Sequence, residues 1–156
     1  MAFKQVKNDA SMALLLIRLT LGIVIFAHGA QKVLGWFGGS GFARTIEVFT
    51  TNLSYPLWMV LLLMFIEFCG SLGLIFGLLT RLSAFGIALI MVVCAYQNHL
   101  QNGFFMNWLG QKVGEGFEYH ILVLGMCCAL MSRGGGSYSL DSLFPLGRRR
   151  DFQRIL

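Results

Sequence analysis

Five ionisable residues interrupt the apolar stretches of this chain and are its clearest candidates for chemistry: His28, Lys32, Glu67, His99 and Glu118. An ionisable side chain in hydrocarbon costs at least ~2.5 kcal/mol, so such residues are normally retained for a function or for mutual pairing. Glu67 can act as a proton carrier or as a hydrogen-bond acceptor for a quinone-like ligand. It can equally form an internal ion pair with Lys32 or Arg18 that fixes the helix register. The residues alone leave both interpretations open.

The histidines do not predict a metal site. His28, His99 and His120 form no H-x-x-x-H or H-E-x-x-H pair, and two histidines on separate helices often occur without metal. At 100° per residue, His120 falls roughly opposite Glu118 and therefore away from the expected inner face of its helix. The four cysteines include no C-x-x-C pair. We therefore expect no metal ligand set, no haem and no thiol redox chemistry.

The composition places these residues in a membrane. The chain of 156 residues is 56% hydrophobic and 12% charged, with a mean hydropathy of +0.71, whereas soluble domains carry about 25% charged residues. A helix needs about 20 residues to cross ~30 Å of hydrocarbon. Four segments approach or exceed that length, near 12–34, 57–79, 82–100 and 117–132, although the last is short. We expect an all-α fold, a four-transmembrane-helix bundle that forms a single membrane domain over 1–156.

The distribution of basic residues predicts the orientation of this bundle. Eight would share one side of the membrane: Lys4, Lys7, Arg81, Arg133, Arg148, Arg149, Arg150 and Arg154. Three would lie on the other side: Lys32, Arg44 and Lys112. This bias predicts that both termini are cytoplasmic, with a basic tail over 133–156. The tail suits topology and anionic lipid headgroups, and we expect no nucleic-acid partner.

Small residues predict which helix faces point inward, because helices in lipid associate by close packing. Most ionisable residues share a face with small residues: Lys32 with Gly22 and Gly29, with His28 at the edge of that face, Glu67 with Gly70, His99 with Ala84 and Ala88, and Glu118 with Gly125, Ala129 and Ser132. His120 is the exception. By helical rise these residues converge on the outer half of the bundle. Arg18 is close enough to the cytoplasmic end to snorkel, and Arg81 lies in a tight turn, so we expect structural roles for both.

One further helix is expected between the first two spans. Phe42, Ile46, Phe49 and Leu53 recur at the spacing of an apolar helical stripe, after Ser40 as a possible N-cap. This pattern predicts a short amphipathic helix in the outer interface.

With these residues located, the chain resembles the DoxX family of small bacterial integral membrane proteins over nearly its whole length. The matching pieces are Arg18-Leu19 with Gly22, His28-Gly29 through Lys32, Glu67-Phe68-x-Gly70, Gly77-Leu78-Leu79-Thr80-Arg81, His99 with Asn102-Gly103-Phe104-Phe105, Glu118-Tyr119 and Tyr138-Ser139-Leu140-Asp141. The resemblance implies a four-helix bundle in the bacterial cytoplasmic (inner) membrane. It also implies that some members act as small membrane subunits of quinone-linked sulfur or redox enzymes.

Three functional classes follow. The first is an accessory subunit of a quinone-linked redox complex, with a quinone as the candidate cofactor and a polar site near the outer face. The second is a binding protein or carrier for a lipophilic ligand, and the third is a membrane scaffold that anchors a soluble enzyme. Four helices without a cofactor motif predict no independent enzymatic activity, and at most an oxidoreductase subunit. The expected partners are membrane lipids and either a protein of a redox complex or a second copy of the chain.

Overall fold

The computed structural model describes residues 2–143, with side chains described from Ala10 onward, and every regular element in this range is helical. Three long helices are present. They are α1 (Ala2–Val33), a second formed by α3 (Leu57–Phe65), the π-helical η3 (Ile66–Gly70) and α4 (Ser71–Phe76), and a third formed by α5 (Thr80–Cys94), the π-helical η4 (Ala95–His99) and η5 (Leu100–Asn102). The remaining elements are η1 (Trp36–Gly38), α2 (Gly41–Glu47), the π-helical η2 (Val48–Asn52), α6 (Glu118–Arg133) and η6 (Leu140–Ser142).

Three of these helices are long and apolar enough to cross a membrane: Ala10–Val33, Leu57–Phe76 and Thr80–Asn102. They confirm the first three expected segments, with ends that differ by a few residues. The second ends early because Gly77 adopts a left-handed conformation, with φ 71°, and terminates α4. The fourth expected segment corresponds to α6, whose 16 residues span about 24 Å of helix.

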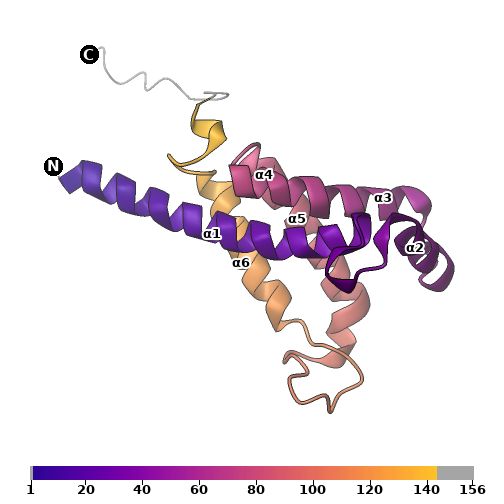
Figure 1. Ribbon diagram of the computed structural model, residues 1–156. Coiled ribbons are helices and arrows are strands. Elements are labelled where there is room, and N and C mark those ends of the chain that lie inside the picture. The colour runs from indigo at the N-terminus through magenta and orange to yellow at the C-terminus, as the bar shows by residue number, and fades with distance from the viewer. Residues whose placement is uncertain (1, 144–156) are drawn as a thin grey trace.

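Glycines on α1 allow the first two long helices to pack closely. Figure 1 shows α1 lying alongside the helix formed by α3, η3 and α4. A Cβ on Gly29 would lie 2.8 Å from backbone atoms of Glu67 and Phe68, and one on Gly22 would lie 2.8 Å from the Ile75 side chain. The predicted inner face of the first span is therefore confirmed, because backbones can approach this closely only where a side chain is missing.

The inner face predicted for the last helix was wrong. The buried residues of α6 are His120, Val123, Cys127 and Leu130, whereas Gly125 is exposed and has no atom within 4 Å of its potential Cβ. Val123, Cys127 and Leu130 join the core that α6 shares with α5 and α1. The prediction failed because it took small residues as the mark of the contact face, and this contact is made by larger apolar side chains that interdigitate.

The prediction that Arg18 snorkels toward the membrane surface was wrong, because the segment after α6 covers its side chain. Its side chain is only 1% exposed, and its Nη2 donates a hydrogen bond to the Tyr138 carbonyl at 2.7 Å. The same segment brings the Asp141 carboxylate to the start of α5, where it accepts hydrogen bonds from the backbone N–H groups of Leu79 (2.7 Å) and Thr80 (2.9 Å). Asp141 thus satisfies two donors that a helix N-terminus leaves free.

Arg81 has the kind of contact expected of a structural residue. Its Nη2 donates to the Ser132 carbonyl at 3.3 Å and so connects the start of α5 to the end of α6. This contact helps to hold together α5 and α6, which pack against each other.

The expected short helix is present as α2, which continues into η2. Its buried residue is Thr45, while Phe42 is 51% exposed and the following Leu53 is 44% exposed. Two residues of the apolar stripe are thus exposed, whereas Ile46 and Phe49 are partly buried. The arginines of the predicted basic tail, Arg148 to Arg150 and Arg154, lie outside the described residues.

Candidate ligand site between the long helices

Four of the five predicted site residues line one cavity of about 310 Å³. These are His28 and Lys32 from α1, Glu67 from η3 and His99 from η4. The other lining residues come from the same helices, from the loop before α6 and from α6 itself: Ile25, Met91, Cys94, Met106, Glu115, Tyr119 and His120. The cavity therefore combines apolar side chains with convergent polar groups, as small-molecule sites do.

Lys32 and Glu67 form an ion pair at this cavity. The Lys32 Nζ lies 2.6 Å from Oε2 of Glu67, and the two side chains are 21% and 8% exposed. Arg18, the other candidate partner, lies about four turns earlier in α1 and instead contacts Tyr138. The pairing exists because Gly29, one turn before Lys32, lets α1 approach the backbone of η3 at Glu67.

Glu118 does not belong to the cavity lining. Its Oε1 accepts a hydrogen bond from the Met106 backbone N–H at 2.8 Å, so this carboxylate fixes the loop that precedes α6. Two backbone hydrogen bonds hold the same loop, from Phe117 N to Gly103 O (3.2 Å) and from Glu118 N to Phe104 O (2.9 Å). The loop in turn presents Met106 and Glu115 to the cavity.

His120 lies inside the bundle, contrary to the helical-wheel prediction. It is 5% exposed, and its ring centroid is 4.4 Å from that of His99. The His99 Nδ1 is 2.9 Å from the Glu115 carbonyl oxygen, which can only accept, so Nδ1 is the donor and Nε2 of the neutral ring is left as an acceptor. The Nδ1 of His120 is buried without a hydrogen-bond partner among the described residues.

Sequence reasoning also missed Cys94 as a site residue. One ligand atom each from Cys94, His99 and His120 lie within 4.8 Å of one another. Cys94 and His99 are five positions apart, which is 140° of rotation on an ordinary α-helix but about one turn on a π-helix, where hydrogen bonds run from i to i+5. The hydrogen bond from Leu100 N–H to the Ala95 carbonyl has this wider spacing. A residue wheel with a fixed 100° step could not find the pair.

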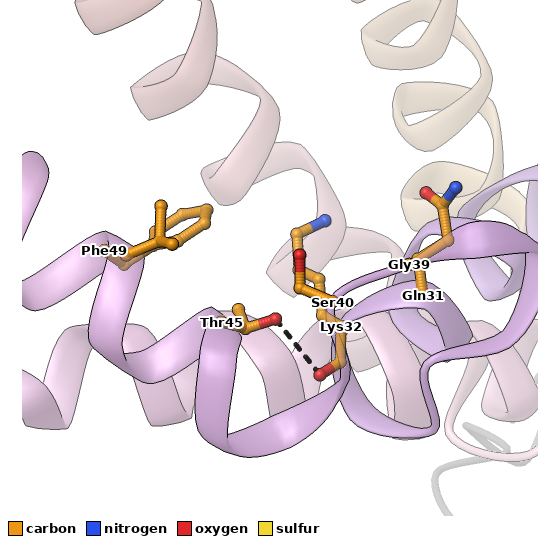
Figure 2. Close-up of a pocket in the computed structure, with 7 residues that line it drawn as sticks. Gln31, Lys32, Gly39, Ser40, Thr45 and Phe49 are labelled. Carbon is orange, nitrogen blue, oxygen red and sulfur yellow. Dashed lines mark hydrogen bonds between the residues drawn. The ribbon is translucent and has the colours of Figure 1, made fainter.

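A second cavity of about 300 Å³ lies between the end of α1 and α2. Its walls are Gln31, Lys32, Gly39, Ser40, Thr45, Val48 and Phe49, and Lys32 is the only titratable member. Figure 2 shows the Thr45 hydroxyl directed at the Lys32 carbonyl, to which it donates a hydrogen bond of 3.3 Å. This contact secures α2 to α1, and the cavity offers far less chemistry than the first.

Comparisons with known proteins identify the family of the chain. A model of the DoxX family matches residues 13–100, which is more than half of the chain and includes His28, Lys32, Glu67 and His99. The inner membrane protein YqjF of Escherichia coli (strain K12) is 26% identical over 137 residues, which cover 88% of this chain and 95% of that protein. An uncharacterized protein of Haemophilus influenzae is 28% identical over 138 residues, covering 86% of this chain and 84% of its own length. No solved structure matches the chain.

Proposed function

The chain belongs to the DoxX family, and from this membership we propose that it is an accessory membrane subunit of a quinone-linked redox complex and holds a quinone in the cavity between its long helices. The observation that carries this proposal is the cavity itself, where the Lys32–Glu67 pair and three histidines lie beside apolar side chains. A scaffold that only anchors a soluble enzyme needs no such cavity. The third functional class is therefore the weakest.

In this proposal the chain forms one membrane domain, and α6 is the fourth helix that crosses the membrane. Large apolar side chains are exposed on all three long helices, including Leu16 (59%), Phe65 (63%) and Phe85 (56%). Exposure on this scale fits lipid better than water. The bilayer would thin locally around α6, whose about 24 Å is shorter than a hydrocarbon core of ~30 Å.

The orientation follows from the basic residues and puts the cavity at the outer face. Both termini are cytoplasmic in this arrangement, and the relative named as an inner membrane protein supports the inner membrane as the location. The exposed apolar residues of α2, Phe42 among them, then lie in the outer interface as the sequence predicted.

The cavity fits a quinone head group in size and in hydrogen bonding. A volume of about 310 Å³ falls at the lower end of small-molecule sites, which suits one substituted ring whose tail extends into lipid. A quinone supplies two-electron, two-proton redox chemistry when bound. Lys32 and His28 can donate hydrogen bonds to its carbonyl oxygens, and the Glu67 carboxylate can accept or return a proton. The electrons come from a partner oxidoreductase, because the chain itself is not proposed to be an independent enzyme.

Binding of a quinone analogue tests this function. The full chain, purified in mild detergent, is titrated with a short-tailed ubiquinone analogue, and binding is followed by isothermal calorimetry. We expect saturable binding that weakens at least about tenfold, or about 1.4 kcal/mol, in Glu67→Gln, which removes the titratable proton but keeps shape and hydrogen bonding. Met91→Trp should abolish binding by filling the cavity, and Ser40→Ala in the second cavity is the matched control.

Two results decide between the functional classes. No binding by the wild-type chain, or equal binding by all variants, would reject the quinone site. Affinity purification from membranes then separates the first two classes. An oxidoreductase recovered with the chain supports the redox subunit, whereas a bound lipophile without such a partner supports the carrier.

A further inference from the structure

We propose that Cys94, His99 and His120, which line the cavity together, bind a single Cu(I) ion. This inference goes beyond the proposed quinone function and departs from the sequence-based prediction that the chain has no metal ligand set. It rests on one ligand atom from each of the three side chains, all within 4.8 Å of one another. Two of these residues come from one helix and the third from another, so the site forms only when the bundle folds.

The ligand atoms are nearly as close to one another as the ligand atoms around a bound metal ion. Metal–nitrogen bonds of about 2.0 Å and metal–sulfur bonds of about 2.3 Å place ligand atoms about 3.3–3.8 Å apart. A movement of about 1–1.5 Å therefore closes the site. Rotation of the Cys94 and His99 side chains can supply it, because both are only partly buried.

The groups around the three ligands are arranged as they are around bound metals. Ligating histidines usually donate their second ring N–H to a carbonyl or carboxylate, which fixes the tautomer. The His99 Nδ1 does this with the Glu115 carbonyl at 2.9 Å and leaves Nε2 free to coordinate. The Asn98 Nδ2 lies 4.0 Å from the Cys94 Sγ, where its N–H can stabilise a thiolate.

His120 provides the second, independent observation. Its side chain is 5% exposed and its Nδ1 has no hydrogen-bond partner among the described residues. A buried polar atom without a partner is costly, commonly about 1–3 kcal/mol, and structures retain few of them. Coordination of this imidazole by an ion would give the ring a partner and would explain why it lies inside the bundle.

The donor set and the charge balance favour Cu(I) over Zn(II). Thiolate and thioether ligands select soft ions, and Met91 and Met106 also line this cavity. One thiolate neutralises Cu(I), whereas Zn(II) would leave a net positive charge in a low-dielectric site, where uncompensated charge is expensive. Binding replaces the thiol proton of Cys94, which is released to solvent.

Competition with a chromogenic Cu(I) chelator tests the proposal. The full chain is purified in mild detergent, reduced, and titrated anaerobically without added quinone. We expect one Cu(I) per chain, with affinity reduced at least about 100-fold in Cys94→Ser and in His120→Gln. Cys128→Ser is the matched control, because that cysteine is exposed and does not line the cavity. X-ray absorption should show sulfur and nitrogen ligands.

Three outcomes would overturn the assignment. Unchanged affinity in both Cys94→Ser and His120→Gln would place any copper elsewhere, and His99→Gln repeats the test if one of these variants loses its monodisperse elution. Zn(II) bound more tightly than Cu(I) by the same residues would reject copper. Absence of stoichiometric binding by the wild-type chain would reject the site. The Glu67→Gln variant should still bind Cu(I), so failure of the quinone proposal and failure of this one are separable.

Discussion

The Lys32–Glu67 pair should show strong energetic coupling because it is largely removed from water. The two side chains are 21% and 8% exposed, and their charged atoms are 2.6 Å apart. Breaking a buried ion pair by removing one partner typically costs about 3–5 kcal/mol, since the remaining charge stays uncompensated. The exposures further predict that the two single substitutions differ in cost.

Lys32→Met should be the more damaging substitution. It leaves the Glu67 carboxylate, at 8% exposure, without a counter-charge, and we expect a loss of about 3–5 kcal/mol in the free energy of unfolding. Glu67→Gln leaves the more exposed ammonium of Lys32, which can reach water and can still donate to the amide oxygen, so about 1–2 kcal/mol is expected. The double variant carries neither charge and should lose no more than Lys32→Met alone. The coupling energy should thus be about 1–3 kcal/mol.

The wild type, the two single variants and the double variant form a double-mutant cycle. The free energy of unfolding of each can be measured in mixed micelles of mild detergent and dodecyl sulfate. The exposed Arg44–Glu47 pair is the control, because its atoms are 2.9 Å apart but its side chains are 63% and 57% exposed. Such surface pairs couple by less than about 1 kcal/mol. A Lys32–Glu67 coupling no larger than that of the control pair would refute the argument that burial makes this contact strong.

Three further predictions concern the ends of the bundle. Gly77→Ala should cost about 2–4 kcal/mol in the same unfolding assay, because φ is 71° and a Cβ would overlap the Arg18 guanidinium. The control Gly125→Ala should be neutral or stabilise by up to about 1 kcal/mol, and equal effects of the two substitutions would contradict this prediction. Asp141→Ala should cost about 1–2 kcal/mol by uncapping α5, with a smaller loss in Asp141→Asn, and an unchanged Asp141→Ala would show that the cap is unimportant. In a background without native cysteines, Val113→Cys should react with an impermeant maleimide from outside the cell, and labelling only after permeabilisation would reverse the proposed orientation.

The sequence predicted the long helices well because their signal is local. Runs of about 20 apolar residues identify them, and the described ends differ from the predicted ones by only a few positions. The inner face of α1 was also predictable, since Gly22 and Gly29 lie where backbones approach within 2.8 Å. These successes gave four of the residues that line the cavity.

Contacts between distant segments could not be predicted in the same way. Arg18 is buried by a segment 120 positions later, and no periodicity records that Tyr138 will accept its hydrogen bond. The face of α6 was mispredicted because Gly125 and Ala129 looked like contact residues, although Val123 and Cys127 make the contact. Residue size indicates how closely two helices can approach, but not whether a second helix is there.

The π-helical segments explain why the sequence predicted only some of the residues of the site. A π turn adds one residue, so every side chain after it is rotated by about 100° relative to an α-helix. Glu67 lies within one such segment and His99 ends another, and both side chains reach the same cavity. The third segment, η2, carries none of the residues that line this cavity, so a π turn alone does not mark a site. What distinguishes the other two is that they interrupt helices able to cross a membrane, where every backbone group must still find a partner. In both of these helices the π turn thus carries a side chain that lines the same cavity as polar groups on α1 and α6.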